Sequence, residues 1–572
     1  MKVTSKRSLW MFRFFDKNWL LMGIILTAAI LRLWNLNNNP PSLTPDEAAL
    51  GYNAYSILKT GRDEYGQFMP IIFKSFGDYK PGLYVYLTVP FVATFGLNEW
   101  SARLPSALAG VLMVYIIYRF ILLFLEFEKT NLLSTNYYLL ANLSALMAAT
   151  SPWLIHFSRG AWEANISLML TLLGIYFFLK SFKKPKSIIL SSICFSFTFI
   201  TYQGAKLSTT LVLLILAIVF WNEVKKKLST EKSTLIVSAA ISVLIAFPAI
   251  LSLFNGQTGR LSVFSVFNYP RPEEYTKTFL QKAGEVKDNL IYYLYHSESL
   301  NFTRGIMGRF FNHFSGRLLF FEGDYQNPNL SAPNHGMLLL LSILLLPLGI
   351  IYLIRNTSKY SKFIFLWLII ASLPAILSRD QVQSVRALNM AIPLVLISAT
   401  GLFYLISIIN RLKYRIPIYY LLTAIFILSF VFFVDAYFVH LPVHNAKYWH
   451  YGFKEAILTI APIQDNYDQI IFQQGYSQPY IYFLFYTKYD PSKYQINAKI
   501  YITNSDVGLV KKLDNIEFQF FSWEPQILFD RTLIVGNNIV IPDIYDENKF
   551  SLIKEIMYPD NLNVALRIME TI

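Results

Sequence analysis

The sequence lacks the features of a soluble or cross-linked protein. Only one of its 572 residues is a cysteine, Cys194, so an internal disulfide and a multi-cysteine metal site are excluded. Charged residues make up 15% of the chain, against about 25% in soluble globular proteins. It contains no nucleotide-phosphate loop motif and no H-E-x-x-H zinc motif. These absences exclude a single soluble domain, a disordered chain and a nucleic-acid-binding module.

Apolar residues dominate instead. Hydrophobic residues make up 54% and aromatic residues 16% of the chain, and the mean hydropathy is +0.40. Lysine and arginine exceed aspartate and glutamate by 50 to 36, a net charge of +14. In a chain this apolar, we interpret the excess as orienting loops across a bilayer, not as binding nucleic-acid phosphates. The composition predicts an integral membrane protein.

Runs long enough to cross a bilayer recur along most of the sequence. An α-helix needs about 20 mostly apolar residues to span the hydrocarbon core. We expect eleven such spans, at about 19–36, 104–125, 133–155, 163–181, 187–203, 207–222, 234–254, 336–354, 362–378, 388–409 and 416–438.

The distribution of basic residues predicts the orientation of these spans. The N-terminus and every second loop together hold 21 lysines and arginines, whereas the other short loops hold only four, Arg159, Lys206, Arg379 and Arg386. Cytoplasmic loops are the ones enriched in lysine and arginine. We therefore expect a multi-pass plasma-membrane protein with a cytoplasmic N-terminus and an extracytoplasmic C-terminus.

One further apolar run, Leu83 to Leu97, requires a decision. It is short, and Pro90 interrupts it. If it crossed the bilayer, every later loop would change sides and most of the basic residues would face outward. We expect an interfacial or re-entrant helix on the outer face.

The predicted architecture has two parts. Residues 1–440 form a helical transmembrane catalytic domain with outer loops at about 37–103 and 255–335. Residues 441–572 form a small extracytoplasmic α/β domain, because short β-like runs alternate there with amphipathic stretches and proline turns. The β-like runs are Gln469 to Phe472, Ala498 to Ile502, Ile516 to Phe521, Leu533 to Ile541 and Val564 to Ile568.

Candidate catalytic residues lie in the first outer loop. Asp46 and Glu47 directly follow the first span, close to any substrate carried by a lipid. Asp46 could alternatively be a simple helix N-cap. Lys80 could pair with a lipid phosphate at the height of the headgroups, or could only extend toward the headgroups. Tyr79, the residue before it, is a further candidate contact of the substrate or the lipid phosphate. Tyr52, in the same loop, is a candidate substrate contact.

Further candidates lie in the later outer loops. Arg159 and Glu163 follow the third span and could serve the reaction or form a simple i,i+4 ion pair. His313 in the large loop is a candidate substrate contact, and Arg386 could close on a phosphate. Without a nucleotide motif, energy for a synthetic reaction must come with the substrate, and a lipid-linked activated donor is the natural candidate.

The sequence resembles the polyprenyl-phosphate-sugar-dependent glycosyltransferases of the GT-C fold, which include protein O-mannosyltransferases and the lipid A aminoarabinose transferase. The resemblance rests on the stretches TPDEAALGYNAYSILKTGRDEYGQFMP, FGDYKPGLYVYLTVPFVATFGLNEWSARLPSALAG, SPWLIHFSRGAWEAN, HFSGRLLFFEGD and YWHYGFKEA. An Asp-Glu pair after the first span, followed by Lys-Pro and then Arg-Leu-Pro-Ser, is the specific part of the pattern.

The resemblance implies roles for individual residues. It implies that Asp46 is the catalytic base with Glu47 beside it, that Lys80 meets the lipid phosphate, and that Glu163 is a second important acid. Aminoarabinose transferases carry Glu-Lys-Pro where this chain has Tyr79-Lys80-Pro81. The identity of the sugar therefore stays open. The acceptor also stays open and could be a protein, a lipid or a glycan.

The expected reaction is an inverting transfer of a sugar from a polyprenyl-phosphate donor to an extracytoplasmic acceptor, with a carboxylate as base. A bound divalent cation could assist, although no ligand cluster requires one. Two other functions compete. A lipid-linked sugar flippase would be expected to carry charges at the membrane midplane, and an O-antigen ligase or polymerase would be expected to have arginine-rich outer loops.

Overall fold

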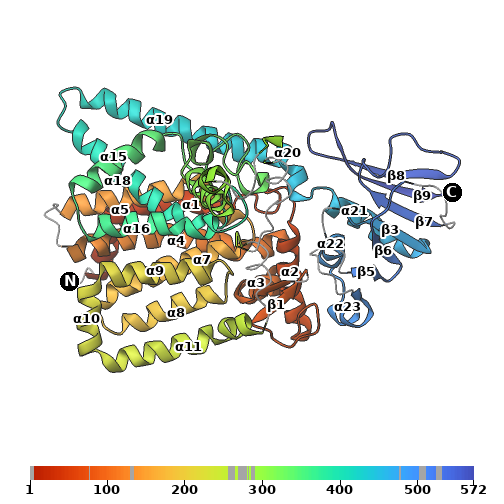
Figure 1. Cartoon of the computed structure of the whole chain (residues 1–572), viewed down its shortest axis with the longest axis horizontal. Coiled ribbons are helices and arrows are strands. Elements are labelled where there is room, and N and C mark those ends of the chain that lie inside the picture. Colours follow the sequence, from red (N-terminus) through yellow and green to blue (C-terminus); the bar gives the residue numbers. More distant parts are fainter. Residues whose placement is uncertain are drawn as a thin grey trace, which may run out of the picture.

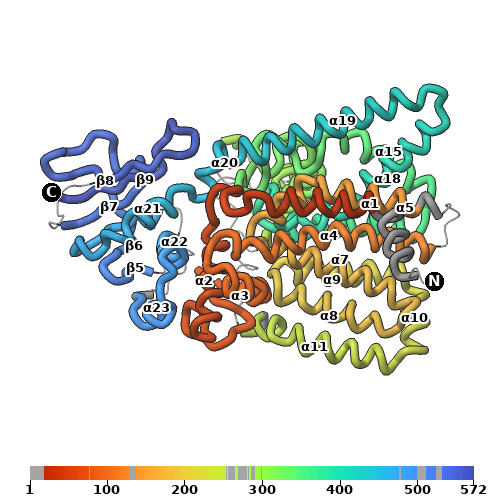
Figure 2. Tube along the Cα trace, turned by 180° about the vertical axis from the view of Figure 1, so that it is seen from behind, coloured from red at the N-terminus to blue at the C-terminus, as the bar shows by residue number. Residues whose placement is uncertain are grey.

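A computed structural model describes residues 6–76, 78–128, 134–255, 265–267, 280, 282–284, 290–475, 478–500, 510–523 and 531–572, with side chains described from residue 19 onward. The molecule is elongated (Figure 1). A bundle of roughly parallel helices occupies one end, and a sheet with short helices occupies the other. The C-terminus lies at the far end of the sheet, as the reverse view also shows (Figure 2).

Each of the eleven predicted apolar runs contains a helix. The helices are α1 (Lys6–Leu33), α4 (Glu99–Glu128), α5 (Ser134–Ala149) with α6 (Pro152–Arg159), α7 (Glu163–Ser181), α8 (Ser187–Phe199), α9 (Ala205–Val219) with α10 (Trp221–Thr230), α11 (Lys232–Phe254), α15 (Ser342–Arg355), α16 (Lys359–Ala371) with α17 (Leu373–Ile376), α18 (Ala391–Ile409) and α19 (Arg415–Asp435). The first six residues of the run 336–354 and the last four of the run 187–203 lie outside their helices.

Length and composition divide these helices into two groups. Within the described residues, six helices can cross a membrane, or up to eight if the bent pairs α5–α6 and α9–α10 each count as one span. The three other predicted spans fall on shorter apolar helices, namely Trp19–Leu33 of α1, α8 and α15. The helical membrane fold is therefore confirmed, while the predicted total of eleven crossings stays a prediction.

Helix packing in the bundle uses small residues where backbones approach closely. A Cβ atom on Gly401 of α18 would lie 1.9 Å from the carbonyl oxygen of Leu345 on α15, and one on Gly349 would lie 2.0 Å from that of Ile397. Glycine therefore permits α15 and α18 to pack backbone against backbone, as is common where membrane helices associate.

The run Leu83 to Leu97 forms helix α3 (Leu83–Phe95), which is 13 residues long and contains Pro90. It follows α2 (Pro45–Thr60) and the antiparallel hairpin of β1 (Ile72–Ser75) and β2 (Asp78–Pro81). All four elements lie at the end of the bundle that faces the sheet (Figure 1). The predicted helix is confirmed, and its interfacial placement stays a prediction.

The second large loop and the connection to the sheet are built from short helices. They are η1 (Tyr292–His296), α14 (Glu298–His313), η2 (Arg317–Phe321), η3 (Pro328–Leu330), η4 (Leu388–Met390), η5 (Ala436–His440), α20 (Leu441–His444) and η6 (Ala446–Trp449). Much of the loop that precedes η1 lies outside the described residues.

The C-terminal part is a seven-stranded mixed sheet with the order β4-β5-β6-β3-β7-β9-β8. β3 pairs in parallel with β6 and β7, and the other pairs are antiparallel. Its elements are α21 (Phe453–Ile460), η7 (Ala461–Asn466), β3 (Gln469–Gln473), α22 (Pro479–Tyr486), α23 (Pro491–Asn497), β4 (Lys499–Ile500), β5 (Val510–Leu513), β6 (Ile516–Gln519), β7 (Thr532–Gly536), β8 (Phe550–Met557) and β9 (Val564–Thr571).

One hydrophobic core joins this sheet to the first outer loop. Tyr52 of α2 and Tyr84 of α3 belong to the same buried cluster as Phe472 of β3 and Tyr480 of α22. The hydroxyl group of Tyr482 also donates to the carbonyl oxygen of Leu43, just before α2, at 2.9 Å. The C-terminal part is therefore packed, through α22 and α23, on the loop that carries the predicted catalytic residues.

Candidate active site

A cavity of about 640 Å³ lies where the helix bundle, the first outer loop and the C-terminal part meet. This volume is within the range of small-molecule sites. Its walls come from widely separated segments, and its polar lining residues are Thr44, Asp46, Lys80, Trp162, Glu163, Tyr202, Gln203, Ser265, Asn327, Asn329, Ser378, Gln383, Arg386, His450 and Gln478.

The start of helix α2 places Asp46 at this cavity. Thr44 is the N-cap, and its hydroxyl accepts a hydrogen bond from the backbone N–H of Glu47, while the Glu47 carboxylate accepts one from the N–H of Thr44. Pro45 occupies the first helical position, where its missing N–H costs nothing. The Asp46 side chain is 39% exposed, so it has access to the cavity from a rigid helix end.

Lys80 forms an ion pair with Asp46. It lies on strand β2, its side chain is only 8% exposed, and its ammonium group lies 5.3 Å from the centre of the Phe76 ring. The adjacent residue Tyr79 points to the other face of the hairpin, because side chains alternate along a strand. Tyr79 does not belong to the described lining of the cavity, and its carbonyl oxygen accepts a hydrogen bond from Gln203 at 2.9 Å. The structure brings Asp46 and Lys80 together and leaves Tyr79 outside.

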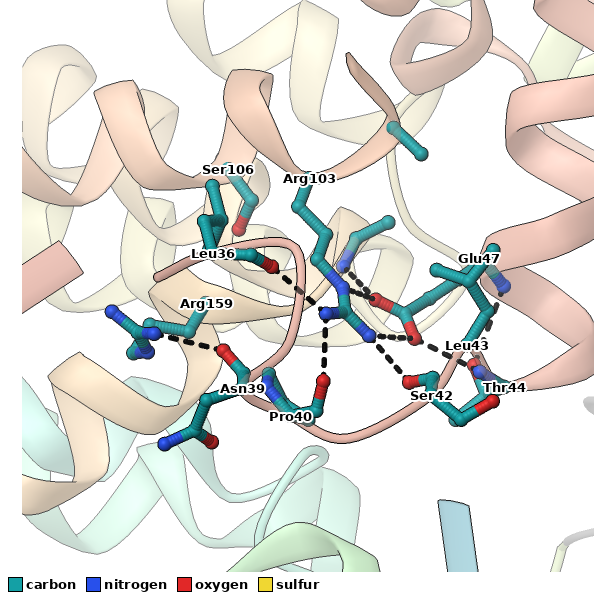
Figure 3. A network of polar contacts seen from close by, with 12 residues as sticks. Leu36, Asn39, Pro40, Ser42, Leu43, Thr44, Glu47, Arg103, Ser106 and Arg159 are labelled. Atoms are coloured by element: carbon teal, nitrogen blue, oxygen red, sulfur yellow. Dashed lines mark hydrogen bonds and ion pairs between the residues drawn. The ribbon is translucent and has the colours of Figure 1, made fainter. Parts of the chain in front are cut away.

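Glu47 lies in a buried network (Figure 3) and is not among the described residues that line the cavity. Its carboxylate accepts hydrogen bonds from Arg103 at 3.0 and 3.3 Å and from the N–H of Ala161 at 2.8 Å. Arg103 also donates to the carbonyl oxygens of Leu36 and Pro40 at 3.0 and 2.9 Å. A helix advances by about 100° per residue, so Glu47 points in a different direction from Asp46. The catalytic role of Glu47 stays a prediction.

Arg159 is likewise buried in backbone contacts. It donates to the carbonyl oxygens of Leu31, Trp34 and Asn39, each at 2.8 Å. Its guanidinium group lies 4.8 Å from the centre of the Phe438 ring. It is not among the described residues that line the cavity. Arg159 therefore ties the end of α1 to α6, and its predicted part in the reaction stays a prediction.

Glu163 and Arg386 both line the cavity. Glu163 begins helix α7. Arg386 lies in the loop before η4, and its guanidinium group pairs with Asp380 at 2.7 Å. Together with Asp46 and Lys80, these residues place two carboxylates and two cations around one space.

His313 supports this loop from behind. Its Nδ1 lies 2.7 Å from the carbonyl oxygen of Arg309, and its Nε2 accepts a hydrogen bond from the N–H of Gln383 at 3.2 Å. Burial lowers the pKa of His313, which keeps the imidazole neutral and its Nε2 able to accept. The position indicates that His313 holds the 380–386 loop, where we had predicted a direct substrate contact.

Tyr52 lies on another face of α2, six residues after Asp46. It is fully buried, and its hydroxyl group donates to the carbonyl oxygen of Tyr489 at 3.1 Å. Its contact with Tyr494 is edge-to-face, with ring centres 6.2 Å apart. Tyr52 therefore joins α2 to the C-terminal part and does not belong to the described lining of the cavity.

Several lining residues were not predicted. His450, in the left-handed conformation with φ 52°, follows η6, and burial lowers its pKa to about 4. Gln203 precedes α9, and Gln478 precedes α22. His450 lies within the YWHYGFKEA stretch that carries part of the family resemblance, so a signal for it was present. Isolated glutamines carry no such signal in a single sequence.

The cavity has limited capacity for a metal ion. Among the described residues, no group of three or more histidine, cysteine, aspartate or glutamate side chains could hold one. Asp46 and Glu163 are the two carboxylates of the described lining, which is fewer ligands than a protein site for a divalent cation usually provides. We therefore derive no step through a metal ion, and the expected divalent cation stays a prediction.

Comparison with known proteins identifies the relationship of the N-terminal part. Residues 22–264 match the family described as dolichyl-phosphate-mannose-protein mannosyltransferase. This match covers Asp46, Lys80 and Glu163 and confirms the resemblance predicted from the sequence. No curated protein matches the chain.

Solved structures of three membrane enzymes are similar at low identity. ArnT from Cupriavidus metallidurans bound to undecaprenyl phosphate has 13% identity and a TM-score of 0.49, covering 82% of this chain and 85% of that chain. An oligosaccharyltransferase from Archaeoglobus fulgidus has 13% identity and a TM-score of 0.46, with 83% and 63% covered. The Pmt1-Pmt2 O-mannosyltransferase complex of S. cerevisiae has 17% identity and a TM-score of 0.30, with 42% and 33% covered.

Proposed function

Since residues 22–264 match the protein-mannosyltransferase family, we propose that this chain is a multi-pass membrane glycosyltransferase that takes its sugar from a polyprenyl-phosphate donor. The observation that carries the proposal is the meeting of Asp46, Lys80, Glu163 and Arg386 on one cavity of about 640 Å³. Such a space can hold a sugar and its phosphate, while apolar helices around it offer a path for the lipid tail.

The two cations form the phosphate site in this proposal. Lys80 and Arg386 line the same cavity, and the donor phosphate carries a negative charge that increases as the bond to the sugar breaks. Donors placed where charge develops stabilise the transition state. Each cation already pairs with an acid, Lys80 with Asp46 and Arg386 with Asp380, so the pair charges are balanced before the donor binds.

Donor binding would also activate the base. The donor phosphate competes with Asp46 for Lys80, and loss of this partner raises the proton affinity of the Asp46 carboxylate. Asp46 then takes a proton from the acceptor hydroxyl or amine as the acceptor atom attacks the anomeric carbon. The new bond forms as the carbon–oxygen bond to phosphate breaks, and polyprenyl phosphate leaves with the electron pair, so the anomeric configuration inverts.

The remaining groups have supporting roles. Glu163 is a second carboxylate that can bind the acceptor or sugar hydroxyls. His450 is neutral at pH 7, since its pKa is about 4, so it does not compete with Lys80 for the charge of Asp46. Glu47 holds Arg103 and the N-terminus of α2. We further propose that the cavity and the C-terminal part, residues 441–572, face the outside of the cell, where a protein, lipid or glycan is the acceptor.

The proposal is tested by sugar transfer in reconstituted liposomes. A panel of polyprenyl-phosphate sugars and nucleotide sugars is offered together with peptide, lipid and glycan acceptors. We expect transfer only from a polyprenyl-phosphate sugar. Transfer from a nucleotide sugar, or movement of an intact lipid-linked sugar to the opposite leaflet without consumption, would overturn the proposal and favour another enzyme class or a flippase.

A further inference from the structure

Gln478 carries hydrogen-bonding capacity that the protein itself does not use. The residue lines the cavity and is only 4% exposed. Neither its side-chain oxygen nor its side-chain nitrogen has a hydrogen-bond partner among the described residues. A buried amide without partners costs free energy, so a group of this kind at a cavity wall indicates a ligand that supplies the missing bonds.

The local fold does not explain the residue. Gln478 is the N-cap of α22, where serine, threonine, aspartate or asparagine would satisfy a free backbone N–H. Its side chain makes no capping hydrogen bond. The next residue, Pro479, begins the helix and has no backbone N–H that a cap could satisfy. Gln478 therefore occupies a capping position while its carboxamide is left for another purpose.

The position of Gln478 is rigidly coupled to the predicted base. Helix α22 packs against α2, and a Cβ atom on Gly51 would lie only 2.6 Å from the Phe485 ring. The hydroxyl group of Tyr482 binds the carbonyl oxygen of Leu43, three residues before Asp46. Tyr480 contacts Phe76, which lines the cavity beside Lys80, with ring centres 6.2 Å apart. Gln478 thus belongs to the wall that carries Asp46 and Lys80.

Other uncharged side chains of the lining also have hydrogen-bonding atoms without a partner among the described residues. Gln203 donates through Nε2 to the carbonyl oxygen of Tyr79 at 2.9 Å, which fixes the orientation of its amide, and its buried Oε1 accepts nothing among the described residues. Gln383 donates to Asp380 at 3.3 Å and also leaves its Oε1 without a partner there. The indole N–H of Trp162 is a further donor without an acceptor in the described part of the chain.

We propose that Gln478 is a specificity-determining residue that binds two adjacent hydroxyl groups of a neutral sugar ring. A carboxamide offers one donor and one acceptor side by side, and each sugar hydroxyl can both donate and accept. Gln203, Gln383 and Trp162 supply the complementary uncharged contacts. The inference rests on the proposed function, and the sugar ring it describes is either that of the donor or that of a glycan acceptor.

The test compares two lipids on the full-length protein in nanodiscs. Binding of polyprenyl-phosphate hexose and of bare polyprenyl phosphate is measured for wild type, Gln478→Leu and Gln495→Leu. Gln495 is a matched control, because it joins α23 to the first outer loop through the carbonyl oxygen of Asp63 at 2.8 Å and does not belong to the described lining. Loss of two hydrogen bonds should weaken hexose-lipid binding about tenfold or more.

The possible results separate the sugar of the donor from that of the acceptor. Weaker binding of the hexose lipid alone, in Gln478→Leu alone, supports contact with the donor sugar. Unchanged lipid binding with a raised KM for a glycan acceptor supports contact with the acceptor sugar. Equal weakening of both lipids, equal effects of both variants, or no change in any of these quantities would overturn the inference. Failure of wild type to bind either lipid would instead refute the proposed function.

Discussion

At the scale of single residues, neighbours in the sequence have different roles. Asp46 lines the cavity, whereas Glu47 next to it binds Arg103 and the N–H of Ala161. The resemblance pointed to Asp46, Lys80 and Glu163, and an outer-loop position pointed to Arg386; all four line the cavity. The sequence could not distinguish them from Glu47, Tyr79 and Arg159, because partners on distant segments decide which way each side chain points.

The two cavity cations should control binding of the lipid phosphate. Lys80→Met and Arg386→Gln are each expected to weaken binding of bare polyprenyl phosphate by about tenfold or more, because charge-assisted hydrogen bonds contribute about 1.5–3 kcal/mol. Lys59→Met is the matched control, since Lys59 lies on the exposed side of α2, the helix that carries Asp46, and is not among the described residues that line the cavity. Equal affinity in the cavity variants and the control would show that the phosphate binds elsewhere.

Glu64 should make the contact between the first outer loop and the C-terminal part sensitive to pH. Burial, with a smaller effect of Asp63, raises its pKa from 4.5 to about 8. The folded state favours the protonated form of Glu64. The contribution of Glu64 to the free energy of unfolding is therefore fully present below pH 4.5 and is lost as the pH rises toward 8.

Thermal unfolding tests this expectation. The midpoint of wild type should fall between pH 5 and pH 8, and Glu64→Gln should reduce that fall because an amide does not titrate. An identical pH dependence in wild type and Glu64→Gln would show that other groups cause it.

At the scale of elements, long apolar runs and alternating β-like runs in the sequence predicted most of the helices and strands. Each of the eleven apolar runs contains a helix, and each of the five β-like runs contributes to a strand. Residues 520–521 and 537–541 extend beyond β6 and β7, and residues 501–502 lie outside the described residues. Strands β5 and β8 were not predicted. β5 contains Lys511 and Lys512, and β8 contains Lys554 and Glu555, so neither has a clean apolar alternation; their pairing with neighbouring strands decides their structure.

The packing of α22 on α2 should be needed for activity. Gly51→Leu places a side chain where even a Cβ atom would lie 2.6 Å from the Phe485 ring, and such overpacking costs about 1–3 kcal/mol. We expect a lower unfolding midpoint and a loss of sugar transfer. Gly23→Leu is the control, because its Cβ position has no atom within 4 Å. Full transfer by Gly51→Leu would show that this contact does not position the site.

At the scale of the whole molecule, the cavity is assembled from both halves of the chain. His450 and Gln478 come from the C-terminal part, while Asp46 and Lys80 come from the first outer loop. The sequence allowed us to predict two parts but not their shared core, because a core that joins segments some 400 residues apart has no local pattern. We therefore infer that the C-terminal part completes the site.

The proposed orientation predicts which surfaces can be labelled from outside the cell. In a Cys194→Ser background, a cysteine at Ile539, which is 87% exposed on the C-terminal part, should react with a membrane-impermeant maleimide in intact cells. A cysteine at Lys413, in a basic loop, should react only after lysis, because lysine-rich loops face the cytoplasm. Labelling of Lys413→Cys but not Ile539→Cys in intact cells would reverse the orientation.

The most direct measurement of the central claim separates binding from turnover in Asp46→Asn. The purified variant is compared with wild type and with Asp465→Asn, a control on the exposed surface, for binding of a polyprenyl-phosphate sugar and for its transfer in liposomes. A general base contributes about 10²- to 10⁴-fold. We therefore predict a loss of turnover of this size in Asp46→Asn alone, with donor binding retained. Turnover equal to that of wild type would contradict Asp46 as the base.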